Sequence, residues 1–255
     1  MKLLSWNVNG IRAVERKGEL EKCIQTYDPD VFLIQETKAQ EDQLTALKTK
    51  YSTYQQVYHS AEKRGYSGTS IWIKKSISNT CVFQTGMPNF QDTEGRILRV
   101  DIEKQTFFSV YFPNGGKSPE AWNGKLQFYD LFLSYINTLR KQGQTVFWAG
   151  DVNCAHEEID LARPKDNKTS IGFLPEERAW ITKVIQNNWV DIFREKHPQK
   201  KVYSWWHVIT RARERNVGWR IDYFFGDKNS MSQVKNIEYL NNQMGSDHCP
   251  VLLEI

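Results

Sequence analysis

The chain has 255 residues, of which 40% are hydrophobic and 25% are charged, and this composition excludes a disordered protein. No segment approaches the ~18 consecutive apolar residues of a membrane span, and the N-terminus turns polar too early for a secretory signal peptide. We therefore expect a cytoplasmic protein. The net charge of +4 permits a polyanionic partner but does not require one.

The chain contains no internal repeat, low-complexity segment or linker, so we expect residues 1–255 to form a single domain. Its four cysteines, Cys23, Cys81, Cys154 and Cys249, lack the spacing of a metal site. They are typical of free thiols in a reducing compartment. No apolar stripe stands out on the expected surface, so we expect a monomer.

Short runs rich in β-branched and aromatic residues predict nine strands. These are Leu3–Trp6, Val31–Gln35, Thr69–Ile73, Ile97–Asp101, Phe107–Tyr111, Thr145–Gly150, Tyr203–Trp206, Arg220–Phe225 and Val251–Glu254. Apolar residues at three-to-four spacing predict helices over Gly18–Thr26, Gln40–Tyr51, Ala121–Lys141 and Glu176–Asn187. Many short strands with fewer, longer helices indicate two packed sheets flanked by helices. A Rossmann fold is less favoured, because no glycine-rich phosphate loop follows the first strand.

Polar side chains follow several of these predicted strands at the point where the strand ends. They occur in six segments: Asn7–Gly10, Gln35–Thr37, Tyr111–Asn114, Gly150–Asn153, Arg220–Phe224 and Gly245–Pro250. The ligand sites of α/β folds gather at strand ends. The sequence therefore predicts one site assembled from distant segments.

Four acidic residues in these segments, Glu36, Asp151, Asp222 and Asp247, are hard oxygen ligands that suit magnesium or manganese rather than zinc. With His248 and several asparagines, they indicate metal-assisted hydrolysis of a phosphate ester. Acyl transfer is disfavoured, because no G-x-S-x-G elbow occurs. Each residue alone is more often a helix cap, a turn former or a core histidine. The interpretation therefore depends on their joint occurrence.

Nine motifs in this chain resemble those of the exonuclease III family of apurinic/apyrimidinic endonucleases, within the endonuclease/exonuclease/phosphatase superfamily. They are SWNVNGIRA (5–13), LIQETK (33–38), GYSG (65–68), TEGR (93–96), YFPNG (111–115), GDVNCAHEEIDLARPK (150–165), GFLPEER (172–178), NVGWRIDYF (216–224) and GSDHCPV (245–251). The motifs occur in family order and span nearly the whole chain. The tryptophans and arginines of residues 205–220 look most like the prokaryotic, including archaeal, branch.

The resemblance implies a DNase I-like fold, a four-layer α/β sandwich in which two central mixed sheets are flanked by helices. It implies magnesium-dependent cleavage of double-stranded DNA on the 5′ side of an abasic site, leaving a 3′-hydroxyl and a 5′-deoxyribose phosphate, with manganese as a substitute metal. Many members also remove blocking groups or nucleotides from 3′ ends. A prokaryotic member would lie with the nucleoid in the cytoplasm.

The resemblance also assigns the metal and the water. Glu36 is expected to bind the magnesium ion, helped by Asn7 and Asp247. Asp151 is expected to activate or position the attacking water, and Asn153 to hold that water or the scissile phosphate. The roles fit an in-line attack, which develops negative charge that a cation stabilises.

The remaining catalytic positions are assigned to the phosphate. His248, oriented by Asp222, is expected to donate to a non-bridging oxygen, because an aspartate behind the ring fixes its tautomer and raises its pKa. Tyr111 and Asn9 are expected to stabilise the developing charge or the leaving oxygen. Either Asp151 or Tyr111 accepts the proton of the nucleophile, and we favour Asp151 because an unperturbed phenol titrates near pH ~10.

The lesion pocket is assigned to the tryptophan-rich segment. Trp205, Trp219 and Ile209 match the family's apolar pocket for an extruded sugar that lacks its base, since aromatic walls pack against deoxyribose and leave little room for a base. Packing in the core is the alternative for each of them, and we prefer it for Trp206.

Three arginines at alternating positions, Arg211, Arg213 and Arg215, are expected to face phosphates along an extended or loop segment, although a solvated charged loop explains them equally well. Several relatives have asparagine in place of Arg211, so this side chain is expected to make the pocket entrance bulkier and more cationic, or to insert into the duplex. At Ser170 some relatives have an asparagine that contacts DNA. Further DNA contacts are assigned to Arg12, Lys17, Tyr66, Arg96, Lys117, Asn114 and Asn167.

Three alternative functions stay open. A 3′-end-processing exonuclease with little activity at abasic sites would share the same site. So would a superfamily phosphatase for inositol phosphates or a sphingomyelinase, although the residues of NVGWRIDYF favour DNA. A catalytically silent DNA-binding module would lack a catalytic acid or histidine, and none is missing here.

Overall fold

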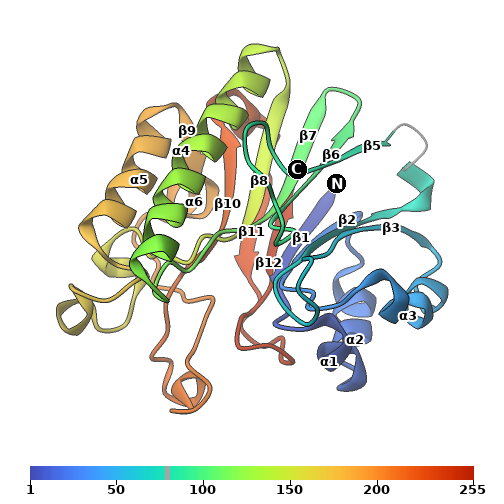
Figure 1. Cartoon of the computed structure of the whole chain (residues 1–255), viewed down its shortest axis with the longest axis horizontal. Helices are drawn as coiled ribbons and strands as arrows, with labels where there is room; N and C mark the ends of the chain where they lie inside the picture. The colour runs from blue at the N-terminus through green and yellow to red at the C-terminus, as the bar shows by residue number, and fades with distance from the viewer. Residues whose placement is uncertain (78–80) are drawn as a thin grey trace.

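The computed structural model describes residues 1–77 and 81–255, whose strands form two six-stranded β-sheets (Figure 1). The first sheet has the order β11 (Asn236–Tyr239), β12 (Val251–Glu254), β1 (Lys2–Asn7), β2 (Val31–Gln35), β4 (Thr69–Lys74) and β3 (Tyr54–His59). The second has the order β5 (Cys81–Thr85), β6 (Ile97–Ile102), β7 (Gln105–Tyr111), β8 (Thr145–Asp151), β10 (Asp222–Asp227) and β9 (Trp189–Asp191). Both sheets are mixed, because β1 and β2 run parallel, β7 and β8 run parallel, and the other pairs are antiparallel.

The two sheets share a core between their facing sides. Leu33 and Ile71 of the first sheet belong to the same buried cluster as Phe107 and Phe147 of the second. Strand β2 is buried on both faces, because Phe32 packs on its opposite side beneath helices. Such double burial explains why its first four residues, VFLI, are a continuous apolar run rather than an alternating one.

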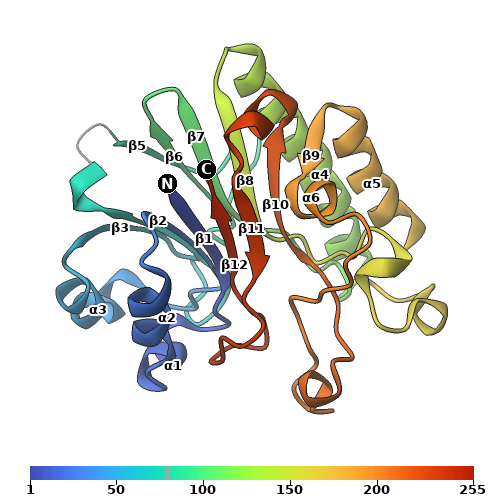
Figure 2. The ribbon, with the colours of Figure 1, turned by 180° about the vertical axis from the view of Figure 1, so that it is seen from behind.

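Helices cover the outer faces of both sheets, as the two views in Figures 1 and 2 show. Helices α1 (Ile11–Arg16), α2 (Glu19–Tyr27) and α3 (Thr45–Lys50) pack on the first sheet, and α4 (Pro119–Lys141) and α5 (Pro175–Gln186) pack on the second. The short α6 (Ile192–Lys196) contacts β10 and β11. The long α4 begins at the N-cap Ser118, whose hydroxyl accepts the backbone N–H of Ala121.

The predicted architecture of two mixed sheets flanked by helices is confirmed, but one predicted strand is wrong. Residues 203–206 form no strand, because they make only isolated bridges: Trp205 pairs with Trp219 and with His248. The helix predicted over Gln40–Tyr51 is shorter, since a 3₁₀ turn at Glu41–Gln43 precedes α3.

Several elements escaped prediction: the strands β3, β5, β9 and β11 and the short helices α1 and α6. All four strands are at or next to sheet edges, where partial exposure or short length weakens the hydrophobic pattern. All four cysteines are free thiols, as expected. No helix in the described ranges has the length and apolar character needed to cross a membrane.

The strand register already assembles part of the predicted site. In the second sheet, Tyr111 of β7 pairs with Asp151 of β8, and Asp151 pairs with Asp222 of β10. Three predicted catalytic residues therefore lie in one row across three adjacent strands. In the first sheet, Asn7 at the end of β1 pairs with Gln35 at the end of β2, directly before Glu36.

Candidate active site

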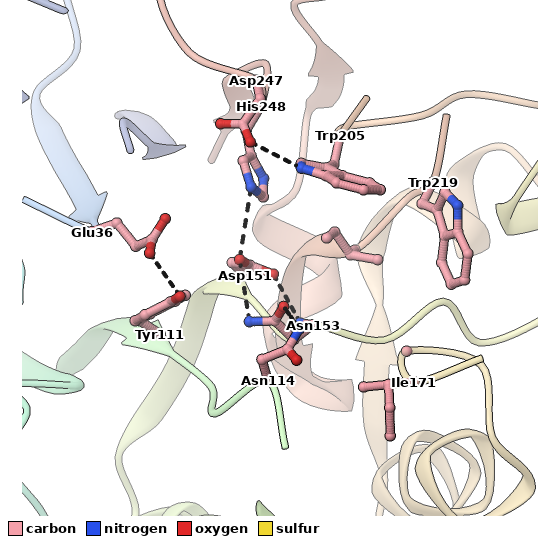
Figure 3. Close-up of a pocket in the computed structure, with 12 residues that line it drawn as sticks. Glu36, Tyr111, Asn114, Asp151, Asn153, Ile171, Trp205, Trp219, Asp247 and His248 are labelled. Carbon is pink, nitrogen blue, oxygen red and sulfur yellow. Dashed lines mark hydrogen bonds and ion pairs between the residues drawn. The ribbon is translucent and has the colours of Figure 1, made fainter. Parts of the chain in front are cut away.

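This row of polar side chains lines one half of a cavity of about 280 Å³, and the other half of the cavity is apolar. Figure 3 shows Glu36 and Tyr111 on one side and Trp205 and Trp219 on the other. The cavity is lined by Glu36, Tyr111, Asn114, Asp151, Asn153, Ile171, Gly172, Trp205, Trp219, Ile221, Asp247 and His248. A polar reactive half thus adjoins an apolar half, a combination typical of ligand sites.

The backbone is strained where the strands turn toward this cavity. Asn9, Glu36 and Asn153 adopt positive φ angles of 45°, 53° and 53°, a left-handed backbone conformation that is uncommon for residues other than glycine. Such strain clusters at functional sites, because the surrounding structure must enforce it. At the end of β8, a side chain at Gly150 would meet the carbonyl oxygen of Val110 at 1.9 Å, so only glycine fits before Asp151.

Asp151 lies at the centre of the cavity wall and is 2% exposed. Its carboxylate accepts hydrogen bonds from the Asn7 amide (3.0 Å) and from the backbone N–H of Asn153 (2.8 Å). Burial raises the pKa of Asp151 to about 7, against the lowering effect of the charge on His248. A carboxyl group that titrates near neutrality is suited to accept a proton from water.

His248 is held by an aspartate, as predicted. Its Nδ1 lies 2.8 Å from Asp222 Oδ2, and its Nε2 points toward Asp151, 3.9 Å from Oδ2. Burial alone would lower the pKa of His248, but the charge of Asp222 and its hydrogen bond outweigh burial and raise the pKa to about 10. The imidazole is therefore a charged donor at neutral pH, directed into the cavity.

Tyr111 and Glu36 form a pair on the opposite side. The Tyr111 hydroxyl donates to Glu36 Oε1 at 2.7 Å. Burial and the charge of Glu36 raise the pKa of Tyr111 well above its ordinary value. The phenol therefore stays protonated, which leaves Asp151 as the better proton acceptor of the two.

Asn9 and Asp247 lie beside this pair in a hydrogen-bonded chain. The Asn9 amide donates to Asp247 Oδ1 at 2.9 Å, and Lys38 donates to the Asn9 amide oxygen. Trp205 donates through its indole N–H to the other oxygen of Asp247 at 3.1 Å. Burial alone would raise the pKa of Asp247, but the charge of His248 and these hydrogen bonds lower it.

The oxygen donors on this side fit a hard divalent cation, and Glu36 is the residue that could serve as its main ligand. The described ranges contain no cluster of three or more histidine, cysteine, aspartate or glutamate side chains with the geometry of a metal site. Magnesium typically uses only one or two carboxylates and keeps several waters, so a lone Glu36 is sufficient. Both oxygens of Asp247 already accept hydrogen bonds, and Asn7 does not line the cavity: its amide supports Asp151 instead.

The apolar half of the cavity differs from the prediction at one position. Trp205 and Trp219 line it, their rings 6.5 Å apart and nearly perpendicular. Ile209 does not, because its side chain is 88% exposed at the tip of the loop that follows Trp206. Trp206 is buried, as expected for a core residue.

Residues missed by the sequence analysis complete the cavity. Ile171, Gly172 and Ile221 form its remaining apolar wall, and Lys38 lies 3.5 Å from Glu36. Gly172 begins the GFLPEER motif, Ile171 directly precedes it, and Ile221 lies inside NVGWRIDYF. Motif membership was therefore available as a signal, but it does not tell which side chains face a cavity.

The three predicted phosphate-binding arginines behave differently from one another. Arg211 and Arg215 are exposed, and Arg211 has a positive φ of 48°. Arg213 turns inward: it donates to the backbone carbonyls of Ser246, Asn241 and Gln243 and stacks on the Trp206 ring at 4.6 Å. The prediction for Arg213 is therefore wrong, since residues 212–215 form a 3₁₀ turn rather than an extended segment.

Arg96 is also turned inward, contrary to its predicted contact with DNA. It is 4% exposed and donates to Glu94, to the Tyr111 carbonyl and to the Tyr66 hydroxyl, with its guanidinium 4.8 Å from the Tyr111 ring centre. Arg96 thus supports Tyr111. Burial leaves it no free face for a phosphate.

The remaining predicted DNA contacts lie on the surface around the cavity loops. Arg12, Lys17, Tyr66, Lys117 and Asn114 are exposed, and Asn114 also lines the cavity. The Asn167 amide donates to the backbone carbonyl of Arg163 at 2.7 Å, and its oxygen accepts from Ser170, so this side chain is engaged locally.

Comparison with known proteins identifies the family. The model of the endonuclease/exonuclease/phosphatase family matches residues 4–248. The chain belongs to this family. It is 39% identical to an exodeoxyribonuclease of Bacillus subtilis, over 100% of this chain and 99% of that protein. It is 34% identical to a DNA-(apurinic or apyrimidinic site) endonuclease of Dictyostelium discoideum, over 98% and 69% of the two chains.

A solved structure gives the same result. The AP endonuclease from Leishmania major superposes with a TM-score of 0.89 at 31% identity, over 99% of this chain and 86% of that one. The resemblance to the exonuclease III family and the predicted four-layer sandwich are both confirmed.

Proposed function

We propose that this enzyme is a DNA repair endonuclease that hydrolyses the phosphodiester on the 5′ side of an abasic site and leaves a 3′-hydroxyl and a 5′-deoxyribose phosphate. One observation carries the proposal: the reactive residues Asp151 and His248 share a cavity of about 280 Å³ with the aromatic wall of Trp205 and Trp219. That wall suits a deoxyribose turned out of the duplex, since flat aromatic rings pack well against an apolar sugar face.

Glu36 would hold a magnesium ion, which supplies charge neutralisation at the phosphate when bound. Asp151 accepts a proton from the attacking water, because its carboxylate is buried and only amides hydrogen bond to it. His248 donates a hydrogen bond through its Nε2–H to a non-bridging phosphate oxygen, while Asp222 keeps Nδ1 in place. Tyr111 stays protonated, and its hydroxyl orients Glu36.

Asn153 and Asn114 stand at the edge of the cavity and fix the reacting group. The Asn114 amide donates to the Asn153 side-chain oxygen at 3.1 Å, and the Asn153 amide donates to the Phe112 carbonyl at 3.0 Å. The pair thereby presents a fixed polar edge to the water or the scissile phosphate. Preorganised dipoles of this kind need no rearrangement during the reaction.

The partner is double-stranded DNA that contains abasic or 3′-blocked lesions. The exposed cations Arg12, Lys17, Lys117 and Arg211 would contact its phosphates, and such contacts position the duplex without reading its sequence. The enzyme acts as a monomer in the cytoplasm, with the nucleoid in a prokaryotic cell. Manganese can replace magnesium, since both are hard cations.

Removal of nucleotides or blocking groups from 3′ ends is the second candidate activity. It is favoured by the full-length similarity to the exodeoxyribonuclease of Bacillus subtilis. A 3′ end places its phosphodiester in the same reactive half of the cavity and has less need of the aromatic wall.

A substrate panel tests the proposal. Three substrates are compared, each with magnesium and with EDTA: a duplex with one tetrahydrofuran abasic analogue, an intact duplex with a recessed 3′ end, and inositol phosphates. We expect a magnesium-dependent cut immediately 5′ of the analogue. Degradation of the intact end without cutting at the lesion would move the function to the second candidate, and release of phosphate from the inositol substrates alone would overturn both.

A further inference from the structure

A buried ion pair lies directly behind the candidate active site. Lys125 of α4 and Glu177 of α5 are each 0% exposed, and the lysine ammonium donates to the glutamate carboxylate. Burial of two opposite charges is costly, and apolar residues of similar volume often serve stability as well or better. The pair therefore invites a role other than simple packing.

The ammonium of Lys125 has three protons, and each has an acceptor. Besides Glu177, it donates to the backbone carbonyl of Asn114 at 3.1 Å and to that of Asn153 at 3.0 Å. Both carbonyls belong to residues that line the cavity. One side chain thus joins the loop after β7 to the loop after β8.

Glu177 ties a third loop to the same point. Its second oxygen accepts the backbone N–H groups of Gly172, at 2.6 Å, and of Leu174, at 3.0 Å. Gly172 forms part of the apolar wall of the cavity. The ion pair therefore holds the loops that carry Asn114 and Asn153 together with the apolar wall of the cavity. We call this wall the lesion wall and the ion pair the anchor.

The surrounding backbone makes room for this anchor. Gly115 has a positive φ of 82°, and a side chain there would meet the Lys125 stem at 3.0 Å. The helices do not depend on the pair for their contact, because Tyr129 of α4 stacks on Trp180 of α5 with ring centres 4.1 Å apart. An exposed pair, Lys183 with Asp130 at 2.7 Å, also links the same two helices.

We propose that Lys125 and Glu177 are positioning residues for catalysis. Lys125 holds the backbone of Asn153, whose N–H in turn holds Asp151 at 2.8 Å. Glu177 holds the wall against which the substrate packs. The inference rests on the proposed function, because it takes Asp151 as the group that acts on the water.

The test replaces both charges at once, so that no buried charge is left alone. In Lys125→Met/Glu177→Met, the helices keep their apolar contacts while the carbonyls of Asn114 and Asn153 lose their donor. The matched control, Lys183→Met/Asp130→Met, removes the exposed pair between the same helices. Steady-state kinetics on abasic duplex are measured at 15 °C, where circular dichroism verifies that each variant is folded.

We expect kcat of the buried double variant to fall about 100-fold with KM within about threefold of wild type, since small misplacements of reacting groups have effects of this size. The control should match wild type. If the kcat of the buried double variant also matches wild type, the proposal is overturned. So would a loss of kcat that disappears when a stabilising osmolyte restores the folded fraction, because this result would make the role purely structural.

Amide hydrogen exchange separates this inference from the proposed function, because it needs no substrate. Peptides that contain residues 112–116 and 151–155 should exchange faster in the buried double variant than in wild type, and not in the control. If wild type fails to cut abasic DNA but exchange changes as expected, the proposed function fails and the anchor stands. Unchanged exchange would remove the anchor whatever the substrate.

Discussion

Two buried clusters in this protein combine aspartates with cationic side chains, and they differ in how the carboxylates are paired. Behind the lesion wall, Arg220 is 0% exposed and is surrounded by Asp160 and Asp191. In the active site, Asp151 and Asp222 surround His248. Both clusters place two carboxylates around a buried cation, and in the first cluster Arg194 adds a second cation at Asp160. The electrostatic outcome is opposite.

In the first cluster every carboxylate faces a guanidinium. Arg220 Nε donates to Asp160 at 2.7 Å, and its two terminal nitrogens donate to Asp191 at 3.1 and 2.7 Å. Burial alone would raise the pKa of Asp160, but the charges of Arg220 and Arg194 outweigh it and lower the pKa to about 2. Such a cluster is complete without any ligand.

In the active site Asp222 has a cation within hydrogen-bond distance, His248 at 2.8 Å, and Asp151 has none in the part of the chain that the structure describes. Asp151 accepts hydrogen bonds from amides, and its nearest cation, His248 Nε2, is 3.9 Å away. Asp222 Oδ1 is buried without a hydrogen-bond partner among the described residues. Carboxylates that are bonded to fixed cations therefore stabilise the fold. A buried carboxylate without a bonded cation can instead bind a proton, a metal or a substrate.

The largest effect on stability should come from Arg220→Met. Loss of the guanidinium leaves Asp191 buried without its cation and Asp160 with Arg194 alone. Breaking a buried pair in this way costs about 3–5 kcal/mol of unfolding free energy. Urea unfolding measures it. The exposed Lys183→Met serves as control, with an expected change of at most about 1 kcal/mol. A loss below 1 kcal/mol for Arg220→Met would show that the first cluster is not a scaffold.

A smaller, pH-dependent effect should follow from Asp160→Asn. The folded pKa of Asp160, about 2, lies below the ordinary value of 3.8, so its ionised form stabilises the fold above pH ~4. This stabilisation, on the order of 2 kcal/mol, is lost as the pH falls from about 4 to about 2. Unfolding free energies of wild type and variant should therefore converge over that window. Parallel curves would contradict the assignment.

The smallest effect concerns the lesion wall. Ile171→Ala removes apolar volume from a half-exposed side chain that lines the cavity. We expect the preference for abasic over intact duplex, measured as a ratio of kcat/KM values, to fall about tenfold. Ile185→Ala on α5, similarly exposed, is the matched control. If both variants have the same ratio of kcat/KM values, the discrimination between abasic and intact duplex depends on other residues of the pocket.

The sequence predicted the central strands and the polar strand ends well, because continuous apolar runs such as that of β2 and turns such as that after β8 have strong local signals. It could not predict which way a long side chain turns. Arg213 and Arg96 resemble surface cations in sequence, and both are held inward by backbone carbonyls that lie far along the chain, those of Ser246 and Tyr111.

The same limit explains the other differences. Ile209 was assigned to the pocket from the family resemblance, but its side chain is 88% exposed on the loop that precedes the 3₁₀ turn at 212–215. Lys125 gave no signal, and Glu177 gave none beyond its place in the GFLPEER motif, since a lysine and a glutamate on amphipathic helices are ordinarily solvated. Their burial is visible only once α4 and α5 are packed against the second sheet.

The most direct test of this contrast is to measure, for Asp151→Asn, both the single-turnover rate of cleavage at an abasic analogue and the free energy of unfolding. We predict a loss of rate of about 10³-fold or more. The fold should be as stable as wild type or more so, since a costly buried carboxylate becomes neutral. A variant that keeps its rate, or one that loses stability as Arg220→Met is expected to do, would contradict the claim that this cluster is built for chemistry.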